Sequence, residues 1–278
     1  MSGPVEANPW DALRRFTRAR IALGRAGSGL PTAPLLAFEL AHAQARDAVH
    51  QPLDADALHA ALRERARKSI DVHSAAHDRE HYLRRPDLGR RLDEASARTL
   101  HDAAGESVDV VFVIADGLSS RAAATHALPL LDALLPKLEG WKVGPIAVAR
   151  QSRVALGDEI GECLRARFVV MLIGERPGLS SPDSLGIYLT AAPRIGRTDA
   201  ERNCISNVRP EGLDYAAAAA KLHYLLTRAR ALGLTGVGLK DDSDDALSDA
   251  RAPAAASLPA SSSVSLPARS SAPRETDS

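Results

Sequence analysis

Residues 167–207 read RFVVMLIGERPGLSSPDSLGIYLTAAPRIGRTDAERNCISN, and this stretch decides the fold. Its opening run, Phe168–Ile173, is apolar at every position, long enough for a strand and too short for a helix. A strand that is apolar on both faces is typical of a sheet covered on both sides. Glycines and prolines follow in the segment Gly174–Ser184. Ligands of open α/β sheets bind at the carboxyl ends of strands, so this loop is a candidate ligand site, and an ordinary turn is the other interpretation.

The composition excludes several classes of protein. The chain has 278 residues, with 35 lysines and arginines against 35 acidic residues, so it has no global basic field for nucleic acid and no acidic one. Its two cysteines cannot form a disulfide framework. No apolar run approaches the roughly 18 residues of a membrane helix. Met1–Glu6 lacks the charged and apolar regions of a secretory signal. We therefore expect a cytoplasmic α/β protein without a nucleic-acid or membrane partner.

The first part of the chain has the pattern of helices. After a flexible lead-in over residues 1–9, the spacing of apolar residues over 10–23 predicts an amphipathic helix. Thr32 is a favourable N-cap for a second helix, and residues 54–67 are dense in Ala, Leu and Arg. These features predict a helical N-terminal domain over residues 10–104.

Two features of this helical part are candidate ligand sites. Arg25 lies in a glycine-rich loop that could bind an anion, but the Gly-Lys-Ser/Thr ending of a P-loop is missing. His73, His77 and His81 are four residues apart and would share one face of a helix. The HExxH pattern of a zinc site is absent, and the neighbouring charges are typical of a solvated face. We therefore favour a solvated surface over phosphate or metal binding at both places.

The pattern changes at Ser107, where strands begin to alternate with helices. Apolar runs predict strands over 108–115, 141–149, 167–173 and 185–190. Helices are predicted over 120–138, 154–165 and 213–232, the last of them closed by Gly233. Strands that alternate with helices predict a parallel sheet with right-handed crossovers. We therefore expect a Rossmann-like, doubly wound domain over residues 105–240.

The predicted sheet lacks the signature of a dinucleotide-binding domain. A G-x-G-x-x-G turn should follow the first strand, but the turn here is Asp116-Gly117-Leu118-Ser119-Ser120. The ligand of this sheet is therefore not expected to be NAD. The final segment, residues 241–278, is rich in Ala, Ser and Pro and has no periodicity, which predicts a disordered tail.

Short motifs are spread in order from about Trp10 to Lys240. They are Leu23-Gly24-Arg25-Ala26-Gly27, Tyr82-Leu83-Arg84-Arg85-Pro86-Asp87-Leu88-Gly89-Arg90-Arg91-Leu92, Asp116-Gly117-Leu118-Ser119, Arg153-Val154, Gly157-Asp158-Glu159-Ile160-Gly161-Glu162, Gly174-Glu175-Arg176-Pro177-Gly178-Leu179 and Asn203-Cys204-Ile205-Ser206-Asn207. In this order the chain resembles the small (light) subunit of ethanolamine ammonia-lyase. The tail lies outside the resemblance, and the N-terminus lacks the long extension of some relatives.

The resemblance implies a cofactor, a reaction and a partner. In this family a separate large subunit holds the substrate in a barrel, and adenosylcobalamin lies between the two subunits. An adenosyl radical abstracts hydrogen from ethanolamine, and the products are acetaldehyde and ammonia. The cofactor supplies the hard chemistry, while protein supplies position, electrostatics and exclusion of water. We therefore expect a subunit of a hetero-oligomer that is inactive alone, in the cytoplasm or within a bacterial microcompartment.

Three cofactor-binding positions of the family map onto Val154, Glu175 and Cys204, and none of them is catalytic. The Glu175 carboxylate can accept hydrogen bonds from the amide arms of a corrin ring, or it is a surface acid. Val154 begins a predicted helix and offers methyl groups to the ligand, or it belongs to the core. Cys204 lies between asparagines in a predicted polar loop, where we expect a contact residue and not a nucleophile. Cys163, in an apolar helix, is expected in the core.

Cobalt ligation by this chain is not expected. Many cobalamin proteins supply a histidine from an Asp-x-His-x-x-Gly motif, and the nearest sequence here, Asp71–Ala76, ends in alanine. This agrees with the base-on binding that the resemblance implies, so we predict that His73 does not ligate cobalt. For the contact with the large subunit we predict the basic segment Arg84–Arg91 and the loop Gly174–Ser184.

Two further functions are compatible with the sequence. One is a self-sufficient α/β enzyme with its own pocket, using Glu175 or Asp116 as base. The other is a scaffold protein of ethanolamine catabolism whose cofactor loop has decayed, although the Gly174–Gly178 and Asn203–Asn207 segments are intact. Activity of the isolated chain distinguishes the first of these from the subunit.

Overall fold

The computed structural model describes Val5, Glu6 and residues 8–243 of the chain. Its α-helices are α1 (Thr32–His50), α2 (Ala55–Glu64), α3 (Arg79–Arg84), α4 (Glu94–Ala103), α5 (Ser120–Leu134), α6 (Leu156–Cys163) and α7 (Tyr215–Leu232). Its strands are β1 (Ser69–His73), β2 (Val108–Ala115), β3 (Ile146–Arg150), β4 (Ala166–Gly174), β5 (Leu185–Ala191) and β6 (Arg202–Val208). Short 3-10 turns are η1 (Asp11–Phe16), η2 (Leu88–Arg90), η3 (Leu135–Lys137), η4 (Asp199–Glu201) and η5 (Gly236–Gly238). The predicted tail lies outside the described residues from Asp244 onward, as does most of the predicted lead-in.

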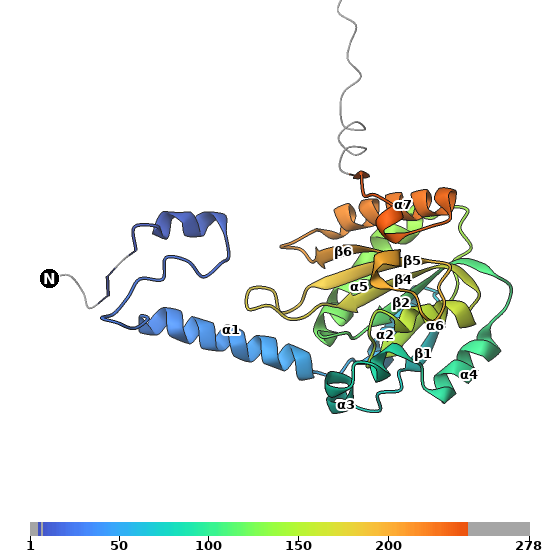
Figure 1. The fold of residues 1–278 in the computed structure, drawn as a ribbon, viewed down its shortest axis with the longest axis horizontal. Coiled ribbons are helices and arrows are strands. Elements are labelled where there is room, and N and C mark those ends of the chain that lie inside the picture. Colours follow the sequence, from blue (N-terminus) through green and yellow to red (C-terminus); the bar gives the residue numbers. More distant parts are fainter. Residues whose placement is uncertain (1–4, 7, 244–278) are drawn as a thin grey trace, which may run out of the picture. The chain divides into compact units, whose positions relative to one another are not determined.

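All the named strands belong to one mixed sheet with the order β1-β3-β2-β4-β5-β6 (Figure 1). Neighbours among β1, β3, β2 and β4 are parallel, whereas β5 runs antiparallel to both β4 and β6. The predicted parallel arrangement is therefore correct for the three predicted strands β2, β3 and β4 and wrong at the β5 end. The connection from Glu175 to Ser184 explains this, because it contains no helix and a parallel return would need a crossover.

Strand β4 is the centre of two hydrophobic cores, one on each face of the sheet. Phe168, Val170 and Leu172 belong to the core that includes residues of α5 and α7. Val169, Met171 and Ile173 belong to the core that includes residues of α6. Each of these side chains is at most 5% exposed. The prediction of a strand covered on both faces is confirmed, and α6 and α7 lie on opposite sides of the sheet in Figure 1.

The segment 10–104 is not wholly helical as predicted. Strand β1 pairs with β3 at one edge of the sheet, so the sheet extends into this segment. The alternation of Ile70 and Val72 was the available signal, and Val72 is only 1% exposed. In place of the amphipathic helix predicted over 10–23, the chain forms the short turn η1, which has no buried residue.

Several predicted elements are confirmed with shifted ends. The second helix begins at Thr32, although Pro31 occupies the cap position and no side chain caps the helix. α5 ends at Leu134 and continues as η3, close to the predicted end. Gly233 closes α7 in the left-handed conformation at φ 72° and donates its N–H to the Ala229 carbonyl at 2.7 Å. None of the helices in the described part of the chain is both long and apolar enough to cross a membrane.

Candidate functional site

The carboxyl ends of β2 and β4 lie side by side at one end of the strands. The motifs that begin at Asp116 and Gly174 lie at these strand ends and contact each other. Leu118 donates its N–H to the Gly174 carbonyl at 2.9 Å. A Cβ atom on Gly174 would lie 2.0 Å from the Ser119 carbonyl oxygen, and one on Gly117 would lie 2.2 Å from the Gly174 carbonyl oxygen. Gly117 also has φ 55°, a conformation that favours glycine. Glycine is therefore required at both positions for the strand ends to touch.

Glu175 follows β4 directly and lies beside the ends of β5 and β6. Its two carboxylate oxygens accept the Asn207 N–H at 3.3 Å each. Its own N–H donates to the Ser184 carbonyl at 3.0 Å. A Cβ atom on Gly186 would lie 3.1 Å from the Glu175 side chain, so glycine there leaves room for the carboxylate. Glu175 is held in place and remains partly exposed, which suits a hydrogen-bond acceptor for a ligand.

Val154 lies in the loop between β3 and α6, and a buried carboxylate holds this loop. Asp116 accepts the N–H groups of Gln151 and Ser152 at 2.8 and 2.9 Å. Gln151 needs this support, because its φ is 54°. Val154 stands in a turn just before α6 and is partly buried, so the prediction that it begins a helix is off by two residues.

Asp116 is 2% exposed, and this decides its role. Burial raises the pKa of its carboxyl group, while the two amide hydrogen bonds and Arg79 oppose that rise. The Arg79 guanidinium lies 3.5 Å from the Asp116 carboxylate. A carboxylate enclosed in this way organises its loop and is unsuited to reach a substrate. The alternative in which Asp116 acts as the base of an independent enzyme therefore loses its geometric basis.

Cys204 lies in strand β6, and its prediction as part of a polar loop is wrong. It pairs with Tyr188 across the antiparallel β5–β6 ladder, and its side chain is exposed. The Cys204 sulfur lies 3.4 Å from the Ser206 hydroxyl. Cys163, by contrast, is buried in α6 as predicted. The contact role of Cys204 stays a prediction, and the strand gives its thiol a defined direction on one face of the sheet.

Tyr188 connects the predicted site residues, and the sequence analysis missed it. It lies on β5 opposite Cys204, and a Cβ atom on Gly186 would come within 3.3 Å of its ring. Burial raises the pKa of the Tyr188 hydroxyl, and the adjacent Cys204 side chain and the Glu175 carboxylate raise it further. The available signal was an aromatic residue in a predicted strand next to the candidate loop. Tyr188 therefore remains a neutral hydrogen-bonding group at physiological pH.

A depression of about 180 Å³ brings these elements together. Its lining consists of Tyr82, Gly117, Leu118, Arg153, Val154, Ile173, Gly174, Glu175, Arg176 and Tyr188. The Arg153 guanidinium lies over the Tyr82 ring, 4.3 Å from its centre, and both residues line the depression. Val154 and Glu175 both line this depression, while Cys204 lies outside it, next to Tyr188. The structure thus gathers all three predicted residues around Tyr188.

A larger hollow of about 1000 Å³ lies at the amino-terminal ends of the parallel strands. It is open to solvent and lined by the first residues of β1, β2 and β3, with basic side chains that include Arg63, Arg67 and Lys142. Open α/β sheets bind ligands at the carboxyl ends of their strands, where Glu175 and Val154 lie. We therefore place the candidate site at the smaller depression.

The histidines do not share a helix face as the spacing suggested. His73 ends β1, and its Nδ1 lies 2.7 Å from the Ser74 carbonyl oxygen. His77, Asp78 and His81 form an exposed group whose ligand atoms lie within 4.8 Å of one another. Asp78 already has a structural role there, because it caps α3 by accepting the His81 N–H at 2.8 Å. This group is remote in sequence from every residue that lines the depression except Tyr82.

Comparison with known proteins gives a consistent result. The profile of the family described as ethanolamine ammonia-lyase light chain (EutC) matches residues 7–240. The ethanolamine ammonia-lyase small subunit of Azotobacter vinelandii is 59% identical over 88% of this chain and 93% of its own length. The corresponding proteins of Ralstonia nicotianae and Pseudomonas aeruginosa are 58% and 57% identical over 88% of this chain and 93% and 92% of their own lengths. The chain therefore belongs to the family of ethanolamine ammonia-lyase small subunits.

Proposed function

We propose that this chain completes an adenosylcobalamin site at an interface with the large subunit of ethanolamine ammonia-lyase. The observation that carries the proposal is the size and openness of the depression at Glu175. Its volume of about 180 Å³ is below the roughly 300–1,000 Å³ of pockets that enclose a drug-sized ligand. A cofactor as large as cobalamin can rest on this surface with one part, and a second protein must cover the rest.

The residues around the depression fit an amide-rich corrin ligand. Glu175 offers a carboxylate to amide N–H groups, and Arg153 offers N–H donors to amide oxygens. The Arg153 Nε is buried and has no hydrogen-bond partner within the described part of the chain. Val154 and Tyr188 add apolar surface beside these polar groups. Few polar groups placed within an apolar surface are typical of cofactor sites.

Each predicted residue then has a distinct part in holding the cofactor. Glu175 orients it by accepting hydrogen bonds, Val154 packs against its edge, and Cys204 contacts it from the exposed face of β6. When bound, adenosylcobalamin supplies the radical chemistry that converts ethanolamine to acetaldehyde and ammonia. This chain contributes position and exclusion of water. His73 lies on β1, at the other end of the sheet order from β6, which supports the proposal that it does not ligate cobalt.

The N-terminal segment supports the need for a partner chain. Large apolar side chains are exposed at the cap of η1, in η1 and along α1, among them Trp10 at 64%, Phe16 at 73% and Leu40 at 61%. Monomeric soluble proteins rarely leave such residues in contact with water over one continuous segment. We propose that the large subunit covers part of this surface, in addition to Arg84–Arg91 and the loop Gly174–Ser184.

Ammonia release from ethanolamine tests this function. This chain, a matching large subunit and their mixture are each assayed with adenosylcobalamin. Activity that is confined to the mixture is the expected result. Activity of this chain alone would favour the independent α/β enzyme with Glu175 as its base. A mixture that assembles and stays inactive would favour the scaffold protein.

A further inference from the structure

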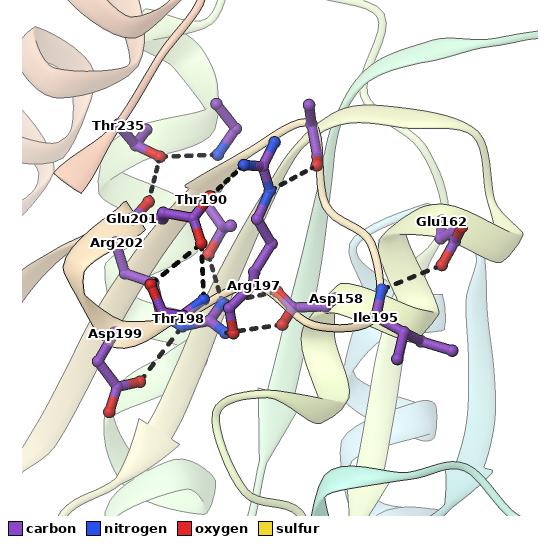
Figure 2. Close-up of polar contacts among 12 residues, drawn as sticks. Asp158, Glu162, Thr190, Ile195, Arg197, Thr198, Asp199, Glu201, Arg202 and Thr235 are labelled. Atoms are coloured by element: carbon purple, nitrogen blue, oxygen red, sulfur yellow. Dashed lines mark hydrogen bonds and ion pairs between the residues drawn. The ribbon is translucent and has the colours of Figure 1, made fainter. Parts of the chain in front are cut away.

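A buried ion pair joins α6 to β6. The Arg202 guanidinium donates to both carboxylate oxygens of Asp158, at 2.6 and 2.7 Å, and each side chain is 2% exposed (Figure 2). Arg202 also donates to the Thr190 hydroxyl and to the Arg197 carbonyl, at 2.9 Å each. The guanidinium is thereby held in one orientation by three different segments of the chain.

The members of this cluster lie on the same elements as the candidate site residues. Asp158 is in the first turn of α6, just after Val154. Arg202 and Thr190 pair across the β5–β6 ladder, two residues along from the pair formed by Cys204 and Tyr188. Side chains two residues apart in a strand point to the same face of the sheet. Arg202 and Thr190 therefore lie on the same face of the sheet as Cys204 and Tyr188, and they are the next pair along that face.

Helix α6 packs on this face mainly through buried apolar side chains and through two close-packed glycines. A Cβ atom on Gly157 would lie 2.5 Å from the Met171 sulfur, and one on Gly161 would lie 2.6 Å from the Pro193 ring. These glycines let the helix approach the sheet closely, but they provide no side chains to interlock with it. The bidentate ion pair supplies a directional contact that apolar packing lacks here.

The loop that connects β5 to β6 closes over the ion pair (Figure 2). Thr198 and Glu201 form a reciprocal capping box, and Arg197 pairs with Glu201. The Ile195 N–H donates to the Glu162 carboxylate at 3.2 Å, which attaches the loop to the far end of α6. Water is thus excluded from the Arg202 guanidinium. A charged hydrogen bond is stronger in such a water-free environment than in solvent.

Stability alone is a weak reason for such a pair. Taking two charges out of water costs free energy that their attraction does not always repay, and apolar replacements are often equally stable. Apolar side chains in place of this pair would not fix the orientation of α6 relative to β6. We propose that Asp158 and Arg202 are positioning residues that set α6 against β6 and so fix Val154 relative to Cys204 and Tyr188 for the cofactor. This inference rests on the proposed cobalamin site.

The test uses the reconstituted complex with the large subunit and measures the Kd for cyanocobalamin by equilibrium dialysis. A triple variant, Asp158→Leu with Thr190→Val and Arg202→Met, replaces the cluster with apolar side chains and leaves no unpaired hydroxyl. Arg65→Met with Asp132→Leu is the control, because Arg65, the C-cap of α2, and Asp132 of α5 also form a bidentate pair, which is 37% and 50% exposed and lies away from the candidate site. The Tm and the assembly of each variant are recorded alongside.

We expect the triple variant to keep its Tm and its assembly but to bind cyanocobalamin on the order of tenfold more weakly, because misplaced contacts lose affinity. The KM for ethanolamine at saturating cofactor should not change, and the control should bind as the wild type does. A stable triple variant with a Kd within about twofold of wild type would overturn the inference. Should the triple variant not fold, Thr190→Val alone removes one hydrogen bond and should weaken binding about threefold. An unchanged Kd there would also overturn it.

A second readout does not depend on the cofactor. Amide hydrogen exchange in α6 and β6 should become faster in the triple variant, while exchange in β2 stays as in the wild type. A wild-type complex that fails to bind cyanocobalamin would overturn the proposed function, and the exchange measurement would still decide whether the ion pair sets α6 against β6. Equal exchange in variant and wild type would sink the positioning role.

Discussion

Strands β4 and β6 belong to the same sheet but differ in what covers them. β4 is buried at nearly every position, between α6 on one face and α5 with α7 on the other. On β6, Ile205 and Val208 are buried towards the α7 core, while Cys204 and Ser206 are exposed. The difference separates a structural strand from a strand that can meet a ligand.

The largest effect is expected where β4 ends. Gly174→Ala places a Cβ atom 2.0 Å from one backbone oxygen and 2.6 Å from another, the carbonyls of Ser119 and Asp116. Backbone atoms in a packed strand end cannot move away cheaply, so we expect destabilisation of at least about 3 kcal/mol, measured by denaturant unfolding. Gly105→Ala is the control, since a Cβ atom there meets nothing within 4 Å. A Gly174→Ala protein as stable as that control would mean that the two strand ends are not in contact.

A smaller effect is expected on the open side of the site. Glu175→Gln keeps the shape of the side chain and removes its charge, so we expect unchanged stability and about tenfold weaker cyanocobalamin binding by the reconstituted complex. His73→Gln is the control, and it should change neither the affinity nor the absorption spectrum of the bound cofactor. If Glu175→Gln binds as tightly as wild type, Glu175 is only a surface acid. A changed spectrum in the His73 variant would contradict base-on binding without a histidine ligand.

The smallest expected effect is a difference in how fast the two cysteines react with a thiol reagent. Burial raises the pKa of the Cys163 thiol, so it forms little thiolate at pH 8, whereas Cys204 is exposed on β6. A thiol reagent should therefore modify Cys204 quickly and Cys163 only after unfolding, as peptide mass mapping can determine. In the complex with the large subunit and cyanocobalamin, Cys204 should be protected. Rapid labelling of Cys204 in the loaded complex would rule out its contact with the cofactor.

The sequence predicted best the elements whose signals are local. β2, β4 and β5 are apolar runs, and α7 has a left-handed glycine at its end, so each was recognised with nearly correct bounds. β1 was missed because its short alternation lies within a stretch that otherwise resembles helix. β6 was missed for a different reason. A bulge shifts the register of β5 and β6, and Asn207 has φ 60°, so the strand lacks a clean period of two.

The candidate site was predicted residue by residue, and its neighbours were not. Val154, Glu175 and Cys204 were implied by the family resemblance, and the fold places them near one another. Arg153 is the sequence neighbour of Val154, whereas Tyr188 joins them only because a strand that is distant in sequence reaches the same end of the sheet. Sequence patterns report which faces are apolar, but they do not report which distant polar groups face each other.

The sequence by itself determined the family, the two-sided burial of β4 and the glycines at the strand ends. Each of these follows from local composition or from motifs that can be read along the chain. The tertiary structure alone decided the antiparallel direction of β5, the enclosure of Asp116 and the partnership of Asp158 with Arg202. Such features depend on how distant segments pack, because a charge is stabilised only by the partner that the fold brings to it.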